Sequence, residues 1–221
     1  MRTSVVAALS GAFCLFGIST ASAAPANNWT GFYFGVQGGA GWADTQWTRP
    51  SSMASTGNFS GSGAIFGGTV GKNWAAGQMV FGVEADLSAT DIKPVAPGGL
   101  GCTGCATALN WLGTVRGRAG FVATPEVLLF ASGGLGIGGF THTYALQPAF
   151  SHSATSLGWT AGGGVEVALS QNWTAKAEYL YLDLGGQVAC PPASSCGSGT
   201  VVNNDYFRAQ IVRVGLNWQI P

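Results

Sequence analysis

The 221-residue chain carries nine basic and nine acidic residues, so its formal net charge is zero and only 8% of its residues are charged. Roughly 25% of an ordinary soluble domain is charged, and a protein that binds nucleic acid needs a basic patch that this chain lacks. The composition therefore gives no basis for nucleic acid as a partner and leaves few charges to solvate a surface.

The chain begins with a predicted signal peptide over residues 1–23. Arg2 precedes an apolar run that ends near Ile18, and Ala21-Ser22-Ala23 has the small-x-small pattern of a cleavage site. The apolar run is too short to be a convincing membrane-spanning helix. We expect an exported mature domain over residues 24–221, with no composition shift or linker that divides it.

Eight segments of about a dozen residues follow in which one face is apolar and the other is polar or small. About ten residues rising 3.3 Å each and tilted near 40° cover roughly the 25 Å apolar band of an outer-membrane barrel, so the lengths fit membrane-spanning strands. The predicted strands are 31–42, 61–74, 78–88, 108–122, 127–138, 155–169, 173–184 and 205–219.

The faces of these strands are inverted relative to a soluble sheet. Arg116 and Arg118 share one face of their strand, whereas the other face, from Leu109 through Val115 to Phe121, has no polar side chain. Because an even number of strands closes without a free edge, the pattern predicts an all-β fold, an eight-stranded antiparallel transmembrane β-barrel.

The connections alternate in length, which predicts the orientation. Those at 75–77, 123–126 and 170–172 are short, whereas those after the first, third, fifth and seventh strands are long and polar. Outer-membrane barrels have short periplasmic turns and long extracellular loops. We therefore expect both ends of the mature domain on the periplasmic side of a Gram-negative outer membrane.

Tryptophans mark both ends of the predicted strands in the apolar register. Such rings form girdles where the bilayer core meets the headgroups. The expected outer girdle is Trp42, Trp111 and Trp159, and the expected inner girdle is Trp74, Trp173 and Trp218.

The inward face collects four acids and four bases. An eight-stranded barrel is just wide enough for its own side chains, so we expect ion pairs that plug the lumen, although inward glycines such as Gly39 and Gly71 leave room for a narrow, weakly conducting path. Paired carboxylates also occur in glycosidases, but here each has a neutralising base, and we expect no enzyme activity. The predicted network is Glu84, Asp86, Arg116, Arg118, Glu166, Lys176, Glu178 and Arg213.

Several motifs, taken in order, resemble the small eight-stranded outer-membrane β-barrel proteins of the porin-like, opacity and surface-antigen type of alphaproteobacteria. They include Trp29-Thr30-Gly31-Phe32-Tyr33, the segment 113–120, the segment 176–181 and the closing 212–218. The resemblance implies contact with outer-membrane lipid, assembly by the barrel-insertion machinery and a structural or surface-antigen role, with weak porin activity. The alternative is a binding protein or adhesin that acts through its extracellular loops, for example on haem or a host surface.

Four cysteines lie in the long connections after the third and seventh strands. Four cysteines allow three pairings, and close spacing in an oxidising compartment favours Cys102 with Cys105 and Cys190 with Cys196. A zinc site that uses all four is disfavoured, because five residues separate Cys190 from Cys196, more than the two to four usual between zinc-ligating cysteines. The two loops are also expected on opposite sides of the barrel mouth.

The two histidines of the chain, His142 and His152, fall in the predicted third long loop. Two histidines ten residues apart in a polar loop are more often solvated than ligating, although together they could hold a metal or haem. We expect no cofactor, and the sequence identifies no extracellular ligand.

Overall fold

The computed structural model describes residues 28–98, 104–144, 150–190 and 202–220, so the expected signal peptide lies outside the described residues. Within them, the strands are β1 (Gly31–Arg49), β2 (Ala54–Ala76), β3 (Met79–Ile92), β4 (Ala106–Thr124), β5 (Val127–Tyr144), β6 (Phe150–Ala168), β7 (Trp173–Asp183), β8 (Gln187–Cys190) and β9 (Val202–Gln219). No helix in this part of the chain is long and apolar enough to cross a membrane.

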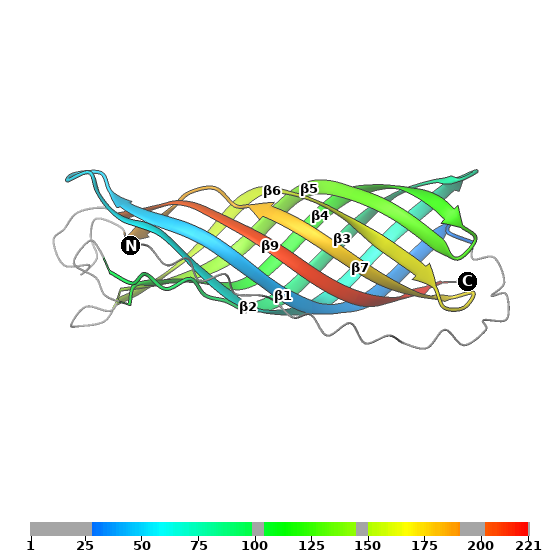
Figure 1. The fold of residues 1–221 in the computed structure, drawn as a ribbon, viewed down its shortest axis with the longest axis horizontal. Helices are drawn as coiled ribbons and strands as arrows, with labels where there is room; N and C mark the ends of the chain where they lie inside the picture. Colours follow the sequence, from blue (N-terminus) through cyan, green and yellow to red (C-terminus); the bar gives the residue numbers. More distant parts are fainter. Residues whose placement is uncertain (1–27, 99–103, 145–149, 191–201, 221) are drawn as a thin grey trace, which may run out of the picture.

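Eight of these strands close into a ring. Every neighbour pair is antiparallel, the order is β1 to β7 followed by β9, and β9 pairs back onto β1. Figure 1 shows the barrel from the side, with the strands strongly tilted. The predicted eight-stranded antiparallel barrel is therefore confirmed. The fourth long connection contains an additional short strand, β8, that pairs with residues 202–204 at the start of β9.

The alternation of faces sets the position of every side chain in the ring. In β3 the residues alternate between exposed and buried along almost the whole strand. Large apolar side chains such as Val83, Val115 and Val214 are on the outside, where they are 52–64% exposed. Short turns join β2 to β3, β4 to β5 and β6 to β7 at one end of the barrel, which we call the inner end; the opposite end is the outer end.

Several strands are longer than the sequence predicts, and most of the added length is at the outer end; at the inner end, β2 and β4 are each longer by two residues. The first connection, expected to be long, is a turn at 50–53, because β1 and β2 remain paired as far as Arg49 and Ala54. A bulge between Gln46 and Thr48 shifts the register there. This hairpin, blue to cyan in Figure 1, projects beyond the rest of the barrel.

The predicted length of the third long loop is also wrong, because the loop is shorter. β5 continues to Tyr144 and β6 begins at Phe150, so only 145–149, outside the described residues, separate them. His142 and His152 are therefore strand residues, directly opposite each other in the β5–β6 ladder, and not loop residues as predicted.

Candidate functional site

The eight predicted inward charges all lie in the lumen, buried to 6% exposure or less. Five strands contribute one or two of them each, because charged residues two apart along a strand share the inward face. They are Glu84 and Asp86 on β3, Arg116 and Arg118 on β4, Glu166 on β6, Lys176 and Glu178 on β7, and Arg213 on β9. We call these eight residues the charge network.

Arg116 is the centre of the outer half of the network. Its guanidinium forms ion pairs with Glu84, with Asp86 at 3.0 Å and with Glu178. Arg213 joins Asp86 at 3.1 Å and Glu178 at 2.8 Å from the opposite side of the barrel. Two arginines thus share carboxylates from β3 and β7, which ties both sides of the ring together across the lumen.

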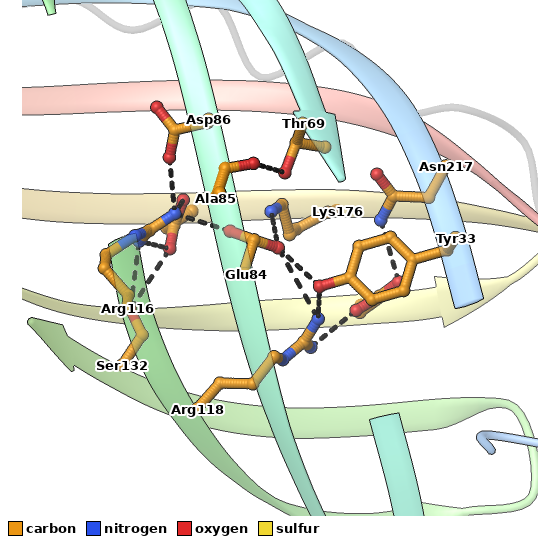
Figure 2. Close-up of polar contacts among 12 residues, drawn as sticks. Tyr33, Thr69, Glu84, Ala85, Asp86, Arg116, Arg118, Ser132, Lys176 and Asn217 are labelled. Atoms are coloured by element: carbon orange, nitrogen blue, oxygen red, sulfur yellow. Dashed lines mark hydrogen bonds and ion pairs between the residues drawn. The ribbon is translucent and has the colours of Figure 1, made fainter. Parts of the chain in front are cut away.

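The inner half of the network is centred on Glu84. Lys176 donates to Glu84 at 2.8 Å, and Arg118 lies 3.8 Å from Glu84 and 2.6 Å from Glu166. Tyr33 of β1 donates its hydroxyl to Glu84 at 2.7 Å and accepts from Arg118 at 3.1 Å. Figure 2 shows Glu84 among Arg116, Lys176 and Tyr33, with Arg118 bound to the same tyrosine.

Uncharged polar side chains that the sequence analysis did not single out satisfy the remaining donors and acceptors. Thr114 donates to Asp86, Thr174 and Asn217 donate to Glu166, and Ser132 accepts from Arg116. The inward register of Tyr33 was available from the alternation in β1, but the specific partners depend on how neighbouring strands are staggered. A buried ion pair persists only when such additional hydrogen bonds compensate for lost hydration.

Glycines opposite the charged residues provide the space that the network occupies. Arg116 is paired with Gly134, and Arg213 with Gly39. A Cβ at Gly134 would lie 2.7 Å from the Arg116 Cα, and one at Gly71 would lie 2.4 Å from the Tyr33 Cζ. At these positions, atoms of the adjacent strands therefore occupy the space beside the glycine.

Apolar layers lie on both sides of the charge network. At the inner end, Trp29, Val80, Leu128 and Ala168 form a small buried cluster. Toward the outer end, a larger cluster crosses the lumen, and its twelve members include the fully buried Leu182. The network therefore lies between two buried apolar clusters, one toward each end of the barrel.

The six tryptophans expected in girdles all have outward positions. Trp42, Trp74, Trp159 and Trp173 are 42–51% exposed, and Trp111 and Trp218 are half-buried. Trp173 is directly opposite Trp218 near the inner end, and Trp159 is opposite Asp183 toward the outer end. We call the two sets the inner belt (Trp74, Trp173, Trp218) and the outer belt (Trp42, Trp111, Trp159).

Beyond the outer belt, a chain of hydrogen bonds joins four strands. Trp47 Nε1 donates to Thr107 Oγ1 at 3.0 Å, Thr107 Oγ1 lies 3.2 Å from His142 Nδ1, and His142 Nε2 lies 3.2 Å from Gln187 Oε1. Because Gln187 Oε1 can only accept, His142 carries its proton on Nε2, and Nδ1 accepts from Thr107. We call these four residues the outer cap.

The outer cap holds His142 in its neutral form. The side chain is 1% exposed and stacks on Phe140, with Trp47 edge-on to it. Burial lowers the pKa of His142 to about 4, and the nearby His152 adds to this effect. Both ring nitrogens already have partners, so the geometry does not support His142 as a ligand of haem or metal.

Of the four cysteines in the long connections, Cys105 and Cys190 lie within the described residues. Cys105 is fully buried and disulfide-bonded. Cys102 and Cys196 lie outside the described residues, so the favoured pairing stays a prediction. Among the residues that the structure describes, no group of three or more histidine, cysteine, aspartate or glutamate side chains could hold a metal ion.

Comparisons with known proteins agree with this architecture. The model of a family described as "Outer membrane protein beta-barrel domain" matches residues 11–219. The chain is 31% identical to the 31 kDa outer-membrane immunogenic protein of Brucella melitensis biotype 1, over 91% of this chain and 88% of that protein. It is 34% identical to a 22 kDa outer membrane protein of Rhizobium leguminosarum bv. viciae, over 72% and 66%.

Among solved structures, the outer membrane protein OprG from Pseudomonas aeruginosa is similar in fold. The TM-score is 0.51 at 12% sequence identity, and the match covers 86% of this chain and 98% of that chain. At this identity the likeness concerns the fold alone.

Proposed function

Because this chain belongs to the outer membrane protein β-barrel family, we propose that it is a non-enzymatic surface protein of the outer membrane whose lumen is permanently closed. The observation that carries the proposal is the charge network with an apolar layer on each side of it. Buried, mutually neutralised charges stabilise a fixed barrel and leave no polar path for a hydrated solute.

The outer rim is the part that such a protein presents to the outside. The β1–β2 hairpin extends well past the outer belt and ends in the turn at 50–53, where Met53 is 85% exposed. Proteins similar to this chain are named outer-membrane immunogenic proteins, which supports a role as a surface antigen. The expected alternative, ligand binding through the outer loops, gains no support from His142, because both of its ring nitrogens are occupied.

Single-channel recording tests the closed lumen. We expect the purified full chain, reconstituted into a planar bilayer at high potassium chloride concentration, to give no discrete current steps. Protease protection of the strands in the same preparation would show that the protein is inserted. Regular steps from inserted protein would overturn the closed lumen and restore a porin function.

Epitope insertion tests the surface role. A tag inserted after Met53 should bind antibody on intact cells, whereas the same tag after Gly77, in the turn between β2 and β3, should bind only after the outer membrane is permeabilised. Labelling of the Gly77 tag on intact cells would reverse the proposed orientation.

A further inference from the structure

Lys72 is an unusual charge on the outside of this barrel. It lies on β2 directly opposite Phe32 and Val83, both of which face outward. In the inner half of the described strands, no other charged side chain is on this face. A charge in contact with the bilayer is costly unless it reaches the interface, so its position calls for a partner.

Aromatic rings hold the Lys72 ammonium at the level of the inner belt. Its Nζ lies 4.5 Å from the centre of the Phe32 ring and 5.3 Å from that of Trp74. Cation–π contacts of this kind orient the ammonium without neutralising it. Lys72 thus places a positive charge where phospholipid phosphates of the periplasmic leaflet lie.

An apolar groove lies on the same outward face of the barrel. Its volume is about 480 Å³, its floor includes Gly38, Ala175 and Ala177, and its walls include Phe66 and Leu216. Gly38 is opposite Phe66 on one side and Val214 on the other, and Val214 is opposite Ala177, so the groove crosses at least four adjacent strands. Small residues on the floor leave a channel between larger side chains.

The separation between the cation and the groove matches the dimensions of a lipid. Val36, at the near end of the groove, is four residues along β1 from Phe32, which lies beside Lys72. Four residues of strand extend about 13 Å. A phosphate bound at Lys72 would therefore send an acyl chain toward the bilayer midplane and into the groove.

We propose that Lys72 and this groove form a binding site for an anionic glycerophospholipid of the periplasmic leaflet, with the phosphate at the Lys72 ammonium and one acyl chain against Gly38, Ala175 and Ala177. The positive charge of Lys72 is complementary to a lipid phosphate, which favours a lipid over a second copy of the chain as the occupant of the groove. The site rests on the membrane placement of the barrel and is independent of whether the lumen is closed.

Native mass spectrometry of the detergent-purified full chain, titrated with palmitoyl-oleoyl phosphatidylglycerol, tests the headgroup half of the site. Lys72→Gln should weaken binding of the first lipid about fivefold, as expected for one cation near a lipid headgroup. The matched control is Lys93→Gln, which removes an exposed cation from the connection between β3 and β4. Equal binding by wild-type protein and Lys72→Gln would overturn the proposal.

Filling the groove tests the acyl-chain half. Ala177→Leu should weaken phosphatidylglycerol binding, whereas Ala119→Leu, an outward substitution on β4 away from the groove, should not. The shift of the folded barrel on unheated gels shows that each variant is folded. A lipid-free dimer that Ala177→Leu dissociates would assign the groove to a second copy and overturn the lipid site, as would equal loss in both leucine variants.

Discussion

Glu84 on β3 accepts a hydrogen bond from Lys176 on β7 at 2.8 Å, across the lumen and 92 residues away in the chain. The same carboxylate also binds Arg116 and Tyr33. Strands that are not neighbours in the sheet are thus joined through the interior, and the stability of the barrel depends on side chains as well as on the ladder.

Removing Arg116 tests this dependence. Arg116→Met leaves the buried carboxylates of Glu84, Asp86 and Glu178 short of a cation, and should lower the free energy of unfolding by about 3 to 5 kcal/mol. Urea-induced unfolding in lipid vesicles, followed by tryptophan fluorescence, measures the change. Arg208→Met, which removes an exposed ion pair with Asp183, should leave the midpoint near that of the wild type. Similar midpoints for both variants would show that the charge network is dispensable.

Glycine opposite the network provides a second test. Gly134→Ala places a Cβ 2.1 Å from the Val115 carbonyl oxygen and 2.7 Å from the Arg116 Cα, so backbone must shift. We expect a loss of about 1 to 3 kcal/mol in the same unfolding assay. Gly117→Ala is a matched control on the adjacent strand, because its Cβ meets only the Gly133 carbonyl oxygen, at 3.9 Å. An equally large loss of stability in Gly117→Ala would show that the effect does not depend on crowding in the lumen.

Substitution by a charged residue tests whether the outward face contacts lipid. Val115 is 63% exposed in the middle of β4. Val115→Arg should cost about 2 to 4 kcal/mol if that surface contacts the bilayer core. The control variant Met53→Arg, in the outer turn, should have the same midpoint of urea-induced unfolding as the wild type. Tolerance of arginine at position 115 would contradict the assignment of faces.

The outer cap should weaken in acid. Because the pKa of His142 is lowered from 6.5 to about 4 in the folded cap, the opened cap binds the proton more tightly. The stabilisation is complete above pH 6.5 and is lost as the pH falls toward 4. Hydrogen exchange of β8 amides, corrected for intrinsic rates, should therefore show opening increased by about one to two orders of magnitude at pH 4.5 relative to pH 7.5. His142→Gln should remove most of this dependence, and an unchanged profile in that variant would assign it to other groups.

Alternation along the strands was sufficient to predict the ring, its inward charges and its outward tryptophans. The alternation is informative because every side chain between the belts faces either lipid or the lumen. A charged and an apolar side chain therefore cannot exchange faces. Glu84 and Asp86 are inward for the same reason that Val83 and Ala85 are outward.

The same signal fails beyond the outer belt. Residues such as Asp44, Gln46 and Thr48 face water on the outside, Thr45 and His142 face inward, and polarity no longer distinguishes the two faces. The bulge in β1 further shifts the register. The longer hairpins, β8 and the buried position of His142 therefore depend on tertiary pairing that the sequence pattern does not contain.

Arg213 lies on β9, the strand that pairs with both β7 and β1 and so completes the ring. An incomplete sheet without β9 holds four carboxylates of the network and only three of its cations, on a surface that is open. Full neutralisation is reached only when Arg213 meets Asp86 and Glu178. Charge balance of the lumen thus depends on ring closure, because the cation that completes it lies on the strand that pairs with both β7 and β1.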